Sequence, residues 1–344
     1  MKMDFLKDFA SKFKSEPSDV VGLDISADCM NAVRMRKTDT QTSVLAVDSL
    51  PLPETLSGNI EDIDPLILPP RLRAKYVSLA LDGEDGIIKL LSFPGQFNEE
   101  SESKIMESMG IENPNDYRIS YKVITEGHAN TESKVLVTAV PADKAQRAIN
   151  LFPVGLPAPF SLELSIMATM TAFAQGPGTQ FADTSVGIIN FSSAICSFAL
   201  FNKNSLALIR KFDSGLNSVL DKVQESLGVD RETALGIITD GAFDISQAVN
   251  DVLDPILKQM AVSRDFVERR ENCHVSTIYI AGGIVVSRDA IDTIRSALGV
   301  DIEVWNPMEN LTIDPAAVIS EEHTKQSWRF SGALGACLAT LEEA

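Results

Sequence analysis

The stretch of sequence that decides the fold is VVGLDISADCMNAVRM, residues 20–35. Apolar residues dominate both ends of this stretch, and a short polar turn around Ser26 separates them. Two apolar runs on either side of a turn predict a pair of antiparallel strands. Residues 42–47 repeat the apolar pattern and predict a third strand. The chain therefore opens with a strand hairpin, and Asp24 stands at the end of its first strand.

The same pattern returns at residues 186–201, which read VGIINFSSAICSFALF. Residues 205–211 follow as a third strand, as residues 42–47 do in the first copy. Asn190 stands where the first copy has Asp24, and the turn carries Ser192 and Ser193. A repeated unit of this kind indicates a fold built from two related halves.

Between and after the two copies, strands and helices alternate. The pattern predicts strands over 76–81, 87–92, 117–125, 134–140, 277–281 and 303–305. It predicts helices over 98–109, 141–152, 161–174, 216–227, 231–238, 245–268, 288–298 and 329–341. Gly176-Pro177-Gly178 breaks the chain and marks a boundary, and Gly282-Gly283 ends the strand over 277–281.

Composition excludes several classes of protein. The chain has 344 residues, 44% of them hydrophobic and 23% charged, which is typical of a folded globular protein. Its net charge of -18 argues against non-specific nucleic-acid binding, because such a surface repels phosphates. The four cysteines form no CxxC pair, which favours a reducing cytoplasm. No run of 18 apolar residues occurs, so we expect no membrane span.

Residues 1–16 form an amphipathic segment. Phe5, Leu6, Phe9 and Phe13 fall on one helical face, and four lysines lie around them. Such a segment predicts a short helix that touches a membrane surface or a partner. The alternative is a helix that caps its own domain, since Asp4 and Asp8 reduce the basic character of the segment.

The polar residues at the strand ends indicate a phosphate-binding constellation. Small residues in a tight turn let backbone N–H groups approach a phosphate, and an acid there can hold Mg²⁺ through water. Asp24 and Asn190 occupy such turns, and a Gly-Gly pair at 282–283 can lie flat against a purine or ribose. Glu163, expected on the helix over 161–174, can orient an attacking water. The alternatives are an ordinary turn residue for Asp24 and a solvated helix residue for Glu163.

The order of these motifs resembles the actin/Hsp70/sugar-kinase superfamily and, more closely, the PilM family. That family comprises actin-like proteins of type IV pilus assembly that are related to FtsA. The likeness covers most of residues 19–341. It is carried by VVGLDISADCMNAVRM (20–35), YVSLALDGEDGIIKLLSFPGQFNEE (76–100), KVLVTAVPADKAQRAINLF (134–152), LELSIMATMTA (162–172), SVGIINFSSAICSFALFNKNSLALIRKFDSG (185–215), LDKVQESLGVDRETAL (220–235) and YIAGGIVVSRDAIDTIRSALGVDIEVWNPMENL (279–311).

The resemblance implies an α/β fold of the actin-like, ribonuclease-H-like type with two duplicated lobes. Lobe I is expected to comprise residues 17–83, 151–180 and 326–344, and lobe II residues 181–325. A small inserted α+β subdomain is expected over residues 84–150.

The resemblance also implies a site for ATP or ADP with Mg²⁺. The expected cofactor-binding residues are Asp24, Ser26, Asn190, Ser192, Ser193, Gly282 and Gly283. Asp24 would hold the metal through water, and Glu163 would be the catalytic residue of a weak ATPase. The sequence departs from the family pattern at the turns: Ser26 replaces a glycine, Asn31 a lysine, and Asn190-Phe191-Ser192 an Asp-x-Gly motif. These departures predict that nucleotide binding is weakened or lost, with little or no ATP turnover.

For function, the resemblance implies a cytoplasmic scaffold of a type IV pilus or type II secretion-like machine, peripheral to the inner membrane. Its partner would be the N-terminal cytoplasmic peptide of a single-span, PilN-like inner-membrane protein, with self-association a further property. One alternative is an active Mg-ATP-binding ATPase or a small-molecule kinase. Another is an FtsA-like filament adaptor tethered to the membrane by residues 1–16.

Overall fold

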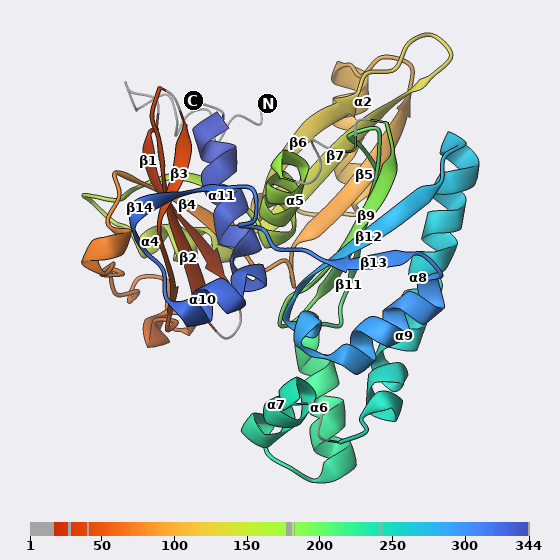
Figure 1. Cartoon of the computed structure of the whole chain (residues 1–344). Coiled ribbons are helices and arrows are strands. Elements are labelled where there is room, and N and C mark those ends of the chain that lie inside the picture. Colours follow the sequence, from red (N-terminus) through yellow and green to blue (C-terminus); the bar gives the residue numbers. More distant parts are fainter. Residues whose placement is uncertain are drawn as a thin grey trace. The chain divides into compact units, whose positions relative to one another are not determined.

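The computed structural model describes residues 17–342 apart from 27, 28, 40, 177–180, 182, 241 and 242. The amphipathic segment 1–16 lies outside the described residues. The chain divides into two compact units, which we describe separately (Figure 1). Unit 1 comprises Met1–Gly176 and Pro307–Ala344, and unit 2 comprises Pro177–Asn306.

Unit 1 is built on a six-stranded sheet. In spatial order its strands are β14 (Thr312–Val318), β3 (Thr42–Leu50), β2 (Met30–Lys37), β1 (Asp19–Ile25), β4 (Tyr76–Leu81) and β8 (Ala158–Leu164). β1 is antiparallel to β2 and parallel to β4, and β4 is parallel to β8. Helices α5 (Ser165–Gln175) and α11 (Ser331–Glu342) pack together, and α11 contacts β1, β2 and β4.

Small residues bring α11 unusually close to its neighbours. A Cβ at Gly335 would lie 1.7 Å from the Ala168 carbonyl oxygen of α5. A Cβ at Gly22 of β1 would lie 2.0 Å from the Ala333 carbonyl oxygen. These contacts explain why α11 has an apolar sequence around its whole circumference: the helix is buried on nearly all sides.

The other side of this sheet is covered by residues 51–72 and by α4 (Ala142–Asn150). The covering chain includes the 3-10 turns η1 (Glu54–Ser57) and η2 (Pro70–Leu72). Leu23 and Leu79 of the sheet pack with Leu72 and Leu151 into one buried core.

A small subdomain is inserted between β4 and β8. Its three-stranded sheet has the order β5 (Ile87–Pro94), β7 (Glu132–Pro141) and β6 (Tyr117–Thr125), all antiparallel. Two short helices, α2 (Glu99–Ser103) and α3 (Ile105–Met109), and the turn η3 (Pro114–Asp116) join β5 to β6. Ile105 packs with Val135 and Val137 in a separate core, so the insert has its own interior.

Unit 2 is built on a five-stranded sheet. Its strands are β11 (Ser205–Phe212), β10 (Cys196–Asn202), β9 (Ser185–Phe191), β12 (Val275–Gly282) and β13 (Asp301–Val304). The helices are α6 (Leu216–Leu227), α7 (Arg231–Asp240), α8 (Ser246–Glu271) and α9 (Arg288–Leu298). Their apolar faces and the sheet enclose one core that includes Phe191, Phe198 and Leu253.

The two sheets confirm that the halves are related. In unit 1 the order β3-β2-β1-β4-β8 matches the order β11-β10-β9-β12-β13 in unit 2. The strand directions match as well, because each central strand has an antiparallel neighbour on one side and a parallel neighbour on the other. The two predicted hairpins therefore occupy equivalent places in separate sheets.

Several predicted boundaries were wrong. The helix expected over 161–174 begins only at Ser165, because Ala158–Leu164 pairs with β4 as strand β8. The helix expected over 98–109 is two short helices, and the strand expected over 303–305 spans Asp301–Val304. Residues 307–325 belong to unit 1 rather than to lobe II, since β14 pairs with β3.

The remaining short elements are η5 (Gly283–Val286), α10 (Glu321–Lys325) and η6 (Ser327–Phe330). Within the described part of the chain, no helix combines the length and the apolar character needed to cross a membrane.

Candidate functional site

The turn of the first hairpin closes on Ser26. Its N–H donates to the Cys29 carbonyl (3.0 Å), and its hydroxyl donates to the same oxygen (2.8 Å). The Cys29 N–H in turn donates to the Ser26 hydroxyl (3.3 Å). The serine side chain therefore adds two hydrogen bonds that close the turn.

The turn of the second hairpin repeats this arrangement with Ser192. The Ser192 N–H donates to the Ile195 carbonyl (3.0 Å), and its hydroxyl donates to the same oxygen (3.1 Å). The Ile195 N–H donates to the Ser192 hydroxyl (3.4 Å). Two turns far apart in sequence thus use one serine-based closure, and in both the serine N–H is occupied within the turn.

Asp24 is partly buried on the face of the unit 1 sheet that α5 and α11 cover. Its carboxylate accepts a hydrogen bond from the Ser165 hydroxyl at the start of α5. A Cβ at Gly332 of α11 would lie 2.2 Å from Asp24 Oδ2, so the carboxylate lies directly against that helix. Burial raises the pKa of Asp24 to about 7, although the Ser165 hydrogen bond opposes the shift.

A second acid lies beside Asp24. Asp82 follows β4, and its N–H donates to the carbonyl of Ile25, the residue after Asp24 (3.0 Å). Burial raises the pKa of Asp82 as well, and its charge contributes to the raised pKa of Asp24. The sequence analysis missed Asp82 as a partner, because only the parallel pairing of β1 with β4 brings the two strand ends together.

Glu163 lies on strand β8 and not on a helix as predicted. It is in register with Ala80 of β4, which is in register with Asp24 of β1. In-register residues of parallel strands share a face, so Glu163 and Asp24 lie on one face of the sheet about 10 Å apart. The structure therefore brings this acid near the first hairpin from a strand end.

The turn with Ser192 and Ser193 is capped by helix α6. The Leu216 N–H donates to the Ser192 carbonyl (3.0 Å), and the Asn217 N–H donates to the Ser193 carbonyl (2.9 Å). A Cβ at Gly215 would lie 2.6 Å from both of these carbonyl oxygens. The first N–H groups of α6 are thus used within unit 2, which lowers its capacity to hold an anion there.

Gly282 and Gly283 pack against the same turn. Gly282 has a φ of 84°, and its Cβ would lie 2.0 Å from the Phe191 carbonyl oxygen. A Cβ at Gly283 would lie 2.4 Å from the Leu216 side chain. Close packing within unit 2 is therefore a sufficient reason for both glycines.

The other expected binding residue of unit 2, Asn190, is buried on β9. It is in register with Ser197 of β10 and Ala281 of β12. One end of the unit 2 sheet thus carries Asn190, Ser192, Ser193 and the two glycines, whereas unit 1 carries Asp24, Ser26 and Glu163.

Sequence reasoning missed Ser165, Gly332 and Leu216, which carry no motif of their own.

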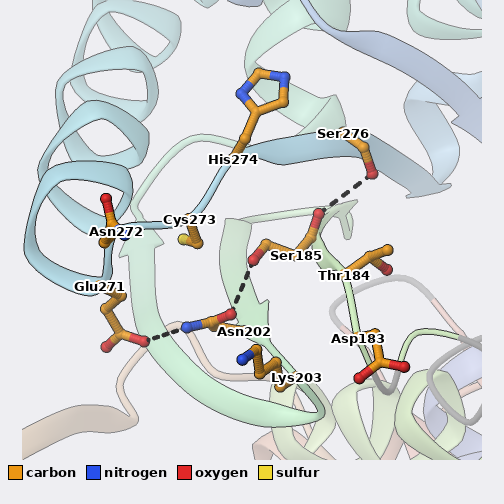
Figure 2. A pocket seen from close by; sticks show the side chains of 10 residues that line it. All are labelled: Asp183, Thr184, Ser185, Asn202, Lys203, Glu271, Asn272, Cys273, His274 and Ser276. Carbon is orange, nitrogen blue, oxygen red and sulfur yellow. Dashed lines mark hydrogen bonds between the residues drawn. The ribbon is translucent and has the colours of Figure 1, made fainter.

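A pocket of about 280 Å³ lies at the opposite end of the unit 2 sheet, where β9 begins (Figure 2). Asn202 lies at its centre: it accepts from the Ser185 hydroxyl (3.0 Å) and donates to Glu271 (2.9 Å). The lining residues are Asp183, Thr184, Ser185, Asn202, Lys203, Glu271, Asn272, Cys273, His274 and Ser276. None of the predicted site residues is among them.

Comparison with known proteins identifies the family. The model of the family described as type IV pilus assembly protein PilM matches residues 22–340. A solved structure, the "PilM-PilN type IV pilus biogenesis complex", superposes with a TM-score of 0.77 at 20% identity and covers 94% of this chain and 98% of that chain. This likeness confirms the expected actin-like fold class.

More distant structures were also found. A Bacteroides thetaiotaomicron protein with an actin-like ATPase fold has a TM-score of 0.48 at 9% identity and covers 88% of this chain and 95% of that chain. The ethanolamine utilization protein EutJ from Carboxydothermus hydrogenoformans has a TM-score of 0.43 at 13% identity, with coverage of 98% and 96%. A search of curated proteins gave no match. Because the family model spans nearly the whole chain, this protein belongs to the PilM family of type IV pilus assembly proteins.

Proposed function

We propose that this PilM-family protein is a cytoplasmic scaffold of a type IV pilus or type II secretion-like machine, held at the inner membrane by a partner. The partner is a single-span, PilN-like protein whose short cytoplasmic N-terminal tail binds here. The observation that carries the proposal is the likeness to a solved PilM–PilN complex over 94% of the chain.

The inserted subdomain offers a place for an extended tail. β5 pairs with β7 on one side and forms an edge of the three-stranded sheet. An edge strand presents backbone N–H and C=O groups that a peptide can pair with. Ile88 and Leu90 are half-exposed on β5, on the face opposite the one that packs into the core of the insert. They supply apolar anchors for alternate side chains of an added strand.

The hydrogen bonding of the turns supports a scaffold with weakened nucleotide binding. The N–H groups of Ser26 and Ser192 are used within their own turns, and the Asp24 carboxylate accepts a hydrogen bond from Ser165. The residues present therefore fit Mg²⁺-nucleotide poorly, and we assign no hydrolytic step to them. Glu163 remains a candidate for orienting water only if a nucleotide binds.

The test is titration of a fluorescent peptide with the sequence of the cytoplasmic tail of a PilN-like single-span protein from the same organism. We expect a Kd of roughly micromolar, typical of a few apolar anchors and backbone hydrogen bonds. Ile88→Glu with Leu90→Glu should weaken binding at least tenfold. Val262→Glu, at an exposed apolar position of unit 2, is the matched control and should leave binding unchanged.

Two results would contradict the proposal. One is binding of the partner protein that stays unchanged when its cytoplasmic tail is removed. The other is Mg²⁺-dependent ATP hydrolysis that Asp24→Ala abolishes, which would favour the active ATPase instead. Tail binding that survives the β5 substitutions would retain the scaffold and reject only this docking edge.

A further inference from the structure

Unit 1 carries an exposed apolar loop at the end of its sheet where β1, β4 and β8 begin. The loop runs Pro153-Val154-Gly155-Leu156-Pro157 and contains no charged residue. Val154 is fully exposed, and Leu156 is 77% exposed. Ile67, in the segment that covers the sheet, is 83% exposed. Exposed apolar side chains are ordinary when they are scattered singly, whereas a contiguous group of them marks an interaction surface.

Hydrogen bonds at both ends join the two segments that carry these side chains. The Leu66 N–H donates to the Leu151 carbonyl (2.9 Å), and the Ala158 N–H donates to the Lys75 carbonyl (2.9 Å). Residues 66–75 and 151–158 are therefore joined at both ends, and on that ground we group Ile67, Val154 and Leu156 as one surface. We call it the loop surface.

Basic side chains lie along the same surface in a chain whose net charge is -18. Arg71, Arg73 and Lys75 alternate with buried residues and are all exposed. Asp48 pairs with Arg71, but within the described part of the chain no carboxylate lies within 4.0 Å of Arg73 or Lys75. Arg34 lies next to Arg71, since its guanidinium reaches the Arg71 carbonyl (3.4 Å), but Asp19 pairs with this guanidinium (2.8 Å). The loop surface thus combines apolar side chains with the positive charges of Arg73 and Lys75.

The chain enters unit 1 at this end. β1 begins at Asp19, and Val20 is in register with Tyr76, the residue after Lys75. Residues 1–16, which precede this strand in the sequence, carry Lys2, Lys7, Lys12 and Lys14 together with apolar residues at helical spacing. Apolar and basic character therefore occur together in both stretches.

We propose that the loop surface docks on an anionic phospholipid bilayer, with Val154 and Leu156 inserted at the headgroup boundary and Arg73 and Lys75 against lipid phosphates. Exposed apolar side chains flanked by cations are the chemistry that such an interface selects. Each basic residue near an anionic leaflet strengthens partitioning about fivefold, and the attraction falls off within a Debye length. The proposal does not rest on the tail-binding function.

The experiment is flotation of the full-length protein, without any partner, with phosphatidylcholine vesicles that contain or lack phosphatidylglycerol. We expect flotation that requires phosphatidylglycerol and weakens as salt rises. Val154→Ser with Leu156→Ser should lower partitioning at least fivefold, and Arg73→Gln with Lys75→Gln at least tenfold. All four side chains are exposed, so these variants should unfold like the wild type.

Matched controls come from unit 2. Val262→Ser with Phe266→Ser removes exposed apolar side chains from α8, and Arg269→Gln with Arg288→Gln removes two exposed charges. Both should stay within twofold of wild type.

Three results would overturn the proposal. The first is failure of the wild type to float with phosphatidylglycerol vesicles, or flotation that the loop-surface variants leave unchanged. The second is loss of flotation on Phe9→Ser with Phe13→Ser while the loop-surface variants bind normally, which would make residues 1–16 the sole lipid contact. The third is a dimer by light scattering that Val154→Ser with Leu156→Ser dissociates, which would assign the surface to a second copy.

Discussion

The hydroxyl of Ser165 donates a hydrogen bond to the carboxylate of Asp24, so the acid beside the first turn is held by the start of helix α5. Gly332 closes the other side of this carboxylate. The position at which the sequence predicts a water-mediated metal ligand is thereby tied to the packing of β1 against α5 and α11. Stability measurements can consequently report on this position without any nucleotide.

The raised pKa of Asp24 predicts how stability depends on pH. The ordinary value is 3.8 and the folded value is about 7, so between these pH values the folded state holds a proton that the unfolded state has lost. The free energy of unfolding should therefore fall as pH rises from about 4 to about 7 and level off above that range. Asp24→Asn, which stays neutral and can still accept from Ser165, should be more stable than wild type at pH 8 by on the order of 2 kcal/mol.

Urea unfolding followed by circular dichroism between pH 4 and 8 measures this difference. Asp213→Asn, at a carboxylate with a 78% exposed side chain, is the control and should track the wild type. A variant Asp24→Asn that is less stable than wild type at pH 8 would show that the charged form is the one the fold favours.

The packing of α11 predicts opposite effects for two glycine substitutions. Gly332→Ala places a Cβ 2.2 Å from Asp24 Oδ2, and the clash should destabilise the protein by about 1–3 kcal/mol. Gly236 lies inside α7 with nothing within 4 Å of its Cβ position. Gly236→Ala should therefore stabilise by about 0.5–1 kcal/mol, as alanine does in a helix interior. Equal effects of the two substitutions in chemical denaturation would contradict the close contact of α11 with Asp24.

The strands around the two turns could be predicted from sequence because each is an apolar run that ends at polar turn residues. β8 could not, since APFSLEL continues directly into the apolar residues of α5 and only pairing with β4 defines it as a strand. β14 could not either: it is largely exposed, contains Pro315, and pairs irregularly with β3. Tertiary pairing decides both strands, and no local pattern shows it.

The candidate site divides in the same way. Asp24 and Asn190 were found because they occupy equivalent places in a repeated pattern. Their surroundings were not, because Ser165, Gly332 and Leu216 come from distant segments and have no distinctive spacing. The sequence identifies which positions are equivalent, whereas only the structure shows which protein groups contact them.

The occupied turns predict weak or absent nucleotide binding. Calorimetry with ATP and Mg²⁺ should give little or no heat, and purified protein should show no magnesium-dependent turnover. Asn190→Asp restores an acid at the second turn but leaves the N–H groups of Ser192, Leu216 and Asn217 engaged. We therefore expect no recovery of turnover in this variant. A gain in ATP affinity on Asn190→Asp would nevertheless support the assignment of that position to a phosphate site.

The glycine pair predicts an energetic coupling that needs no ligand. Gly283→Ala should destabilise unit 2, because its Cβ would lie 2.4 Å from Leu216 Cδ2. The clash involves the end of a flexible side chain, so shortening that side chain should relieve it. Leu216→Ala alone shortens a partly buried leucine and should cost about 1–2 kcal/mol. In the double variant the combined cost should then be smaller than the sum of the two single costs by about 1 kcal/mol.

For Gly282→Ala no second substitution can relieve the clash, since Gly282 combines a positive φ with a carbonyl oxygen 2.0 Å from its Cβ position. Gly282→Ala should therefore be the most destabilising of the three single changes. Urea unfolding of the four variants without nucleotide measures these terms. Strict additivity of Gly283→Ala and Leu216→Ala, or wild-type stability of Gly282→Ala, would show that the glycines are not required by packing and would restore the nucleoside as the reason for them.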